Sequence, residues 1–91
     1  MAIAIVEYRA AGSKASDPGL LGLAQIRLGG LILIKCVAVR RTREGRVYLS
    51  FPSRELRTGE RRHVVRPVDA ASRRWIEEQV IAQLRERGVL P

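Results

Sequence analysis

The sequence has few of the residues that carry enzyme chemistry. It contains one cysteine, Cys36, and one histidine, His63, and it has no HxxxH, CxxC, GxxxxGK[ST] or GxSxG pattern. These residues cannot form a metal cage, a phosphate loop or a nucleophile elbow. The adjacent acids Glu77 and Glu78 would point about 100° apart on a helix, so they cannot act on one bond. We therefore expect a protein that is not an enzyme and that uses no cofactor, metal or small-molecule substrate.

Long apolar runs are also missing. The run Leu31–Ile34 ends at Lys35, and the run at residues 1–6 ends at Glu7, so both are far too short to cross a membrane. Residues 1–8 have no basic region of the kind that opens a signal peptide. A single cysteine cannot form an intramolecular disulfide, and a buried, inert Cys36 in a reducing compartment is the expected case. We expect a cytoplasmic protein with no membrane partner.

Aromatic residues and lysines are scarce as well. Aromatic residues make up 4% of the chain, which argues against a surface that binds bases by stacking. Lys14 and Lys35 are the only lysines, so 15 of the 17 basic residues are arginines. The planar guanidinium matches phosphate in two-point contacts and stacks on bases, so this bias fits anion recognition. A GC-rich genome would produce the same bias, and both explanations stay open.

The positive charge is concentrated in one part of the chain. The formal net charge is +8, and residues 40–74 alone hold eleven arginines against four acidic residues, a net +7. Residues 1–39 contribute +2 and residues 75–91 contribute −1. A basic segment of this kind is the expected electrostatic footprint of a nucleic-acid-binding protein.

The apolar pattern predicts one folded domain over residues 1–91. Runs rich in β-branched residues predict strands at 3–9, 20–28, 31–40, 46–51 and 61–68, and residues 53–60 are expected to form a loop. Asp69 is the expected N-cap of a helix over 70–87, and Gly88 follows its end. We therefore predict an α+β fold, in which an antiparallel β-sheet of about five strands, built from hairpins, carries one C-terminal amphipathic helix.

The central hairpin is expected to be apolar on both faces. A two-residue Gly29-Gly30 turn would place Leu28 opposite Leu31 and Ile26 opposite Leu33. One helix covers only one face of such a sheet. A second copy of the chain would cover the other, so we predict a homodimer. The alternative is that the first strand and the loop after it fold over that face.

The candidate interface is the stretch 51–76, which leads from the fourth strand into the helix. Its arginines are the candidate nucleic-acid-binding residues: Arg54, Arg57, Arg61, Arg62, Arg66, Arg73 and Arg74. If residues 61–68 form one strand, Arg62 and Arg66 project from the same sheet face.

The pair Arg73 and Arg74 is unusual because cations near a helix N-terminus oppose the helix dipole. Such a conflict points to function. The competing interpretation is that Glu77 and Glu78, four residues further on, pair with them. If the arginines bind phosphate, charge reversal of both should abolish binding and leave the thermal midpoint within a few degrees.

Several short motifs point to a family. They are Phe51-Pro52-Ser53-Arg54, Gly59-Glu60-Arg61-Arg62, Pro67-Val68-Asp69 and Ser72-Arg73, followed by an amphipathic helix. In their order and spacing, the run from Leu23 to Leu84 resembles the stage V sporulation protein G (SpoVG) family of small bacterial regulators. Arg66 stands where the family usually has histidine, and Arg61 stands where it has an aromatic residue.

The resemblance implies a β-sheet domain with a C-terminal helix, dimers formed through strands, and binding to DNA and in some members RNA. It also implies roles in septation, sporulation and gene regulation, with basic residues around the helix start, here Arg73 and Arg74, as binding elements. We expect a dimeric, SpoVG-like nucleic-acid-binding regulator. The alternative is a protein-interaction module whose basic face binds an acidic protein, and a ribosome-associated protein is a third possibility.

Overall fold

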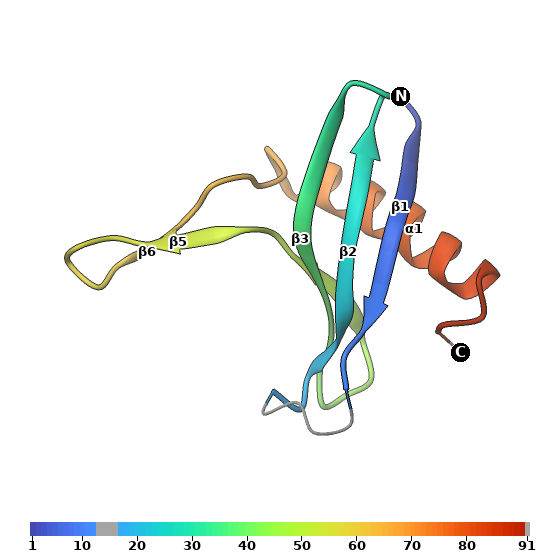
Figure 1. Cartoon of the computed structure of the whole chain (residues 1–91), viewed down its shortest axis with the longest axis horizontal. Helices are drawn as coiled ribbons and strands as arrows, with labels where there is room; N and C mark the ends of the chain where they lie inside the picture. Colours follow the sequence, from blue (N-terminus) through green and yellow to red (C-terminus); the bar gives the residue numbers. More distant parts are fainter. Residues whose placement is uncertain (13–16, 91) are drawn as a thin grey trace.

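The computed structural model describes residues 1–12 and 17–90. A four-stranded antiparallel sheet in the order β1-β2-β3-β4 has helix α1 on one face, and a two-stranded ribbon, β5–β6, projects away from it (Figure 1). The elements are β1 Ile3–Ala10, β2 Leu20–Leu28, β3 Ile32–Arg41, β4 Val47–Ser50, β5 Ser53–Glu55, β6 Arg61–His63 and α1 Ala70–Glu86. The α+β class and the C-terminal helix are confirmed.

The prediction of one five-stranded sheet is wrong. The predicted fifth strand, 61–68, is extended only over Arg61–His63, and its partner β5 lies in the segment predicted as a loop. Pro52 has no N–H group, so the chain cannot continue the ladder that β4 forms with β3. Beyond Pro52 the chain leaves the sheet and forms the ribbon with its own return segment.

The register of the central hairpin also differs from the prediction. Leu28 pairs with Ile32 and Ile26 with Ile34, because the turn includes Leu31 as well as the two glycines. A shift of one residue exchanges the two faces of a strand. Ile34 therefore enters the core at 6% exposure, whereas Leu31 at the tip is 92% exposed.

A β-bulge in the middle of β3 restores the predicted faces further along. Between the pairs Ile26–Ile34 and Ala24–Val37, the single residue Gln25 faces two residues of β3. Cys36 occupies the bulge with φ 59°, and the extra residue returns Val37 to the buried side. Cys36 itself is exposed, so the expectation of a buried cysteine is wrong.

The helix begins and packs as its sequence predicts. Asp69 is the N-cap, and one of its carboxylate oxygens accepts a hydrogen bond of 2.7 Å from the Ser72 N–H. Gly88 follows the helix with φ 75°, a conformation that glycine adopts at low cost. Val80 and Leu84 are fully buried against the inner face of the sheet. They anchor α1 diagonally across the strands.

Gln83 of α1 and Arg87, the residue after the helix, also bind the open edge of β1. The Gln83 amide donates to the Ile3 carbonyl oxygen at 2.6 Å, and its own oxygen accepts the Ile5 N–H at 3.0 Å. Arg87 donates to the Ile5 carbonyl oxygen at 2.6 Å. These bonds occupy backbone groups of Ile3 and Ile5 that a neighbouring strand would otherwise bind, so this edge is protected from pairing with another chain. In the part of the chain that the structure describes, no helix is long and apolar enough to cross a membrane.

Candidate nucleic-acid interface

Four of the seven candidate arginines lie on the β5–β6 ribbon. The ribbon pairs Arg54 with Arg62 and Glu55 with Arg61, and Arg57 lies in its turn. A hydrogen bond of 2.7 Å from the Leu56 N–H to the Glu60 carbonyl oxygen closes that turn. All four arginines are exposed, and the ribbon extends from the body as a narrow arm (Figure 1).

Arg54 and Arg62 are directly opposite each other across the ribbon. Like charges in this position destabilise a strand pair. Arg62 lies 3.5 Å from a carboxylate oxygen of Glu60, but an exposed ion pair of this kind offsets little. Arg54 has no hydrogen bond or ion pair to any described residue. The ribbon therefore presents two neighbouring guanidinium groups, of which only one has an acidic partner.

The remaining ribbon and connector arginines point in other directions. Arg61 is on the opposite ribbon face from Arg62 and donates to the Ser53 hydroxyl at 3.1 Å. Arg66 lies beyond the strand and donates to the carbonyl oxygen of Pro67. The prediction that Arg62 and Arg66 share a sheet face is wrong, because β6 ends at His63.

Arg73 lies at the contact between α1 and β4. It donates to the Leu49 carbonyl oxygen at 2.9 Å, lies 3.4 Å from Glu77, and stands 5.8 Å from the centre of the Phe51 ring. Glu77 is only 7% exposed and accepts the Leu49 N–H at 2.9 Å. The competing interpretation from the sequence, pairing with Glu77, thus describes Arg73 correctly.

These contacts also change what a charge reversal at Arg73 would do. A carboxylate at this position would lie beside the buried Glu77 and would leave the Leu49 carbonyl oxygen without its donor. The expectation that reversing both arginines leaves stability nearly unchanged is therefore incompatible with the contacts of Arg73. Arg74 alone is the appropriate position for that test.

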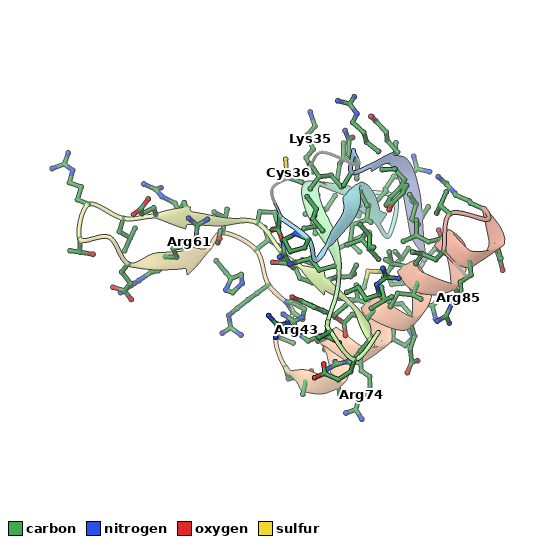
Figure 2. The ribbon with its side chains drawn as sticks, turned by 90° about the horizontal axis from the view of Figure 1, so that it is seen from below. Lys35, Cys36, Arg43, Arg61, Arg74 and Arg85 are labelled. Atoms are coloured by element: carbon green, nitrogen blue, oxygen red, sulfur yellow. The ribbon has the colours of Figure 1, made fainter. Side chains whose placement is uncertain are left out.

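Arg74 is exposed and belongs to a different surface. It lines a groove between α1 and the turn that connects β3 to β4, and it makes no ion pair with Glu78 among the described residues. Figure 2 shows Arg74 on the body of the molecule and Arg61 out on the ribbon. Of the seven candidate arginines, four therefore lie on the ribbon, Arg66 lies between the ribbon and α1, Arg74 is exposed on the helix, and Arg73 is fixed between sheet and helix.

The comparison with protein-family models agrees with this architecture and with the motifs. The SpoVG family model matches residues 1–86, which include every described strand and α1 to its last residue. The chain belongs to the SpoVG family. Membership supports a SpoVG-type regulatory role and confirms the resemblance that the motifs indicate. None of the curated proteins compared with the chain matches it.

Two further arginines of this SpoVG-family chain line the groove beside Arg74, and the motifs did not indicate them. Arg46 comes from the β3–β4 turn and Arg85 from the last turns of α1. A signal for Arg85 was present in the sequence: it lies eleven residues after Arg74, which is three helical turns and returns to the same side of the helix. Arg46 gave no such signal, because its position beside α1 depends on the tertiary fold.

Arg40, which is not a candidate binding residue, has a structural role. Arg40 donates two hydrogen bonds to the Asp17 carboxylate, at 2.7 and 2.8 Å, and a third to the Tyr48 hydroxyl at 3.3 Å. The hydrogen bonds from Arg40 hold the pKa of Asp17 below its usual value, and the partnership raises the pKa of Arg40. This guanidinium is occupied by the protein itself, so we do not assign Arg40 to the interface.

Proposed function

We propose that this SpoVG-family chain is a non-enzymatic, cytoplasmic regulator that binds nucleic acid through the ribbon and the start of α1. The observation that carries the proposal is the ribbon, a narrow exposed arm on which Arg54 and Arg62 are held next to each other at a cost in stability. Phosphate groups would remove that repulsion. We assign phosphate contacts to Arg54, Arg57, Arg61, Arg62, Arg66 and Arg74.

Arg73 has a different part in this proposal. Its contacts with Leu49, Glu77 and the Phe51 ring are internal. It positions the helix start against β4, and its Nη1 nitrogen is engaged by both the Leu49 carbonyl oxygen and the Glu77 carboxylate. We therefore treat it as a positioning residue rather than as a phosphate contact.

The shape of the ribbon favours duplex DNA over duplex RNA. The major groove of B-DNA is about 12 Å wide and accepts a two-stranded β-ribbon. The major groove of A-form RNA is deep and narrow, and side chains cannot read it. A ribbon that carries arginines on both faces would contact both walls of a DNA major groove.

Fluorescence anisotropy with duplex DNA, single-stranded DNA and RNA at several salt concentrations tests the proposal. Binding to duplex DNA should weaken with salt, with a slope of log K against log salt of about −0.9 for each phosphate contact. The variant R54Q/R62Q should lose affinity and flatten the slope by about 2. R9Q/R27Q removes the same charge from exposed positions on β1 and β2 and should bind like the unmodified protein. Absence of binding at low salt would refute nucleic-acid binding.

We also propose that two chains associate through the open part of β3. Because β4 pairs only with Ala38–Arg41, residues 32–37 have no second strand neighbour in the described chain. Leu31, Ile32 and Leu33 beside this edge are exposed. An unpaired edge with apolar side chains is a template for another strand.

Light scattering after size exclusion tests the association. The measured mass should be twice the chain mass of 10.2 kDa. Leu33→Lys should shift the protein toward the monomer, because it places a charge in the proposed contact. An unmodified protein that stays monomeric at high concentration would contradict the association.

One observation favours the alternative, a protein-interaction module. Val64, Val65 and Val68 are exposed beside Arg66 in the chain, and the exposed Trp75 follows in the first turns of α1, so this segment combines apolar side chains with positive charge. Protein interfaces are enriched in aromatic residues and arginine. A complex with an acidic protein, formed by a chain that binds no nucleic acid, would select this alternative.

A further inference from the structure

A basic groove lies on the helix side of the molecule, apart from the ribbon. It has a volume of about 430 Å³ and lies between the β3–β4 turn and the exposed flank of α1. Its apolar lining is Val47, Ile81 and Ala82. Three arginines stand around it: Arg46 from the turn, and Arg74 and Arg85 from the helix.

The helix spaces two of these arginines along the groove. Arg74 and Arg85 are eleven residues apart, and at 1.5 Å per residue the rise between them is about 16 Å. Successive phosphates on one strand of B-DNA are about 3.4 Å apart along the duplex axis and further apart along the strand itself, so this span covers a few phosphates. Arg46 stands on the opposite wall, on the turn between β3 and β4. The three positions fit a strand that runs along the groove.

Two acidic residues, Glu77 and Glu78, also line the groove. Glu77 is buried, and its carboxylate is engaged by the Leu49 N–H and by Arg73. Glu78 is the exposed acid that lines the groove. Three arginines and this one exposed carboxylate line the groove, and the apolar floor offers contact to the sugars of a bound strand.

We propose that this groove is a second contact surface for the sugar-phosphate backbone of the nucleic acid, with Arg46 and Arg85 acting beside Arg74. The inference rests on the proposed function and extends it to an element the ribbon does not touch. Duplex DNA held by the ribbon would continue past the β3–β4 turn and lay one strand along α1. Each arginine would pair with phosphate oxygens, and the apolar floor would face the deoxyriboses.

The full-length variant R46Q/R85Q tests the groove by anisotropy with duplex DNA. At 0.1 M salt each phosphate contact contributes about 8-fold to affinity relative to 1 M, so losing two should weaken binding about 60-fold. The salt slope should flatten by about 2. R9Q/R27Q removes the same charge elsewhere and should stay within about threefold, because distant charges are screened at this salt. Circular dichroism confirms that each variant is folded.

A second variant should act in the opposite direction. Glu78→Gln removes the exposed acid from the groove and should strengthen binding severalfold, whereas Glu7→Gln on the outer face of β1 should not. If R46Q/R85Q and Glu78→Gln both bind like the unmodified protein while R54Q/R62Q loses affinity, the groove inference is wrong and the proposed function stands. If the unmodified protein binds no nucleic acid, both are wrong.

Discussion

Replacement of Glu77 by alanine tests the contacts that hold the start of α1 against the sheet. The Glu77 carboxylate accepts the Leu49 N–H at 2.9 Å and lies 3.4 Å from Arg73, in a place where the residue is 7% exposed. Without it the Leu49 N–H has no acceptor, which costs about 1–3 kcal/mol when the group is buried. Arg73 also loses its counter-ion in a half-buried position. We expect a total loss of about 2–4 kcal/mol.

Equilibrium urea unfolding, followed by far-UV circular dichroism at one protein concentration, measures this loss. In a chain of this size about 1 kcal/mol corresponds to 4–8 °C, so the thermal midpoint should fall by roughly 8–30 °C. Glu77→Gln keeps an oxygen acceptor for the Leu49 N–H and should lose about half as much. Glu78→Ala, one position further along and exposed, is the matched control and should stay within about 0.5 kcal/mol.

The result that would refute this reasoning is a Glu77→Ala variant as stable as the Glu78→Ala control. Such a result would mean that the carboxylate of Glu77 is solvated and that Arg73 is not fixed by it. Arg73, like Arg74, would then be available to a ligand, and its assignment as a positioning residue would be wrong.

Three further predictions concern the sheet and its loops. Cys36→Gly should leave stability unchanged or raise it by about 1 kcal/mol, because glycine adopts the positive φ of the bulge without strain; a lower urea midpoint would contradict this. Arg40→Gln should raise the pKa of Asp17 toward the ordinary value of an aspartate, measured by carboxyl NMR. Because Arg40 lowers that pKa in the folded state, the contact stabilises the protein above the usual Asp pKa and is lost as the pH falls through the lowered one. Gly22→Ala should cost about 1–3 kcal/mol, because the new methyl group would overlap the Tyr8 side chain; unchanged stability would contradict the packing.

Elements that local chemistry determines could be predicted, whereas the register of the sheet could not. Asp69 and Gly88 mark the ends of α1 through bonds and dihedral angles that involve only their neighbours. The pairing of β2 with β3 depends on whether Leu31 belongs to the turn or to the strand, and both choices keep an apolar face. The bulge at Cys36 had no signal either, because a side chain other than glycine rarely adopts a positive φ. The packing of the whole core decides these points.

Most residues of the candidate site could be predicted from the sequence, but the shape of the site could not. The arginines of the ribbon were identified by charge, but β5 was not, since Ser53, Arg54 and Glu55 have little strand propensity. The ribbon forms because Pro52 turns the chain away from the sheet. The groove combines residues that are about 40 positions apart in the chain, which charge counting along the sequence does not bring together.

Arg73 contacts the sheet and Arg74 does not, because the two residues lie on different sides of α1. Going back from the buried Leu84 and Val80 in steps of four, three and four residues leads to Glu77 and Arg73, so both lie on the stripe that faces the sheet. Arg74 is turned about 100° away, toward the groove. A buried ion pair seldom stabilises a fold more than apolar side chains of the same size. The Arg73–Glu77 pair has another effect: it supplies a donor and an acceptor to the Leu49 backbone, which apolar side chains cannot do. These two bonds fix the rotation of the helix about its axis, and that rotation directs Arg74 outward.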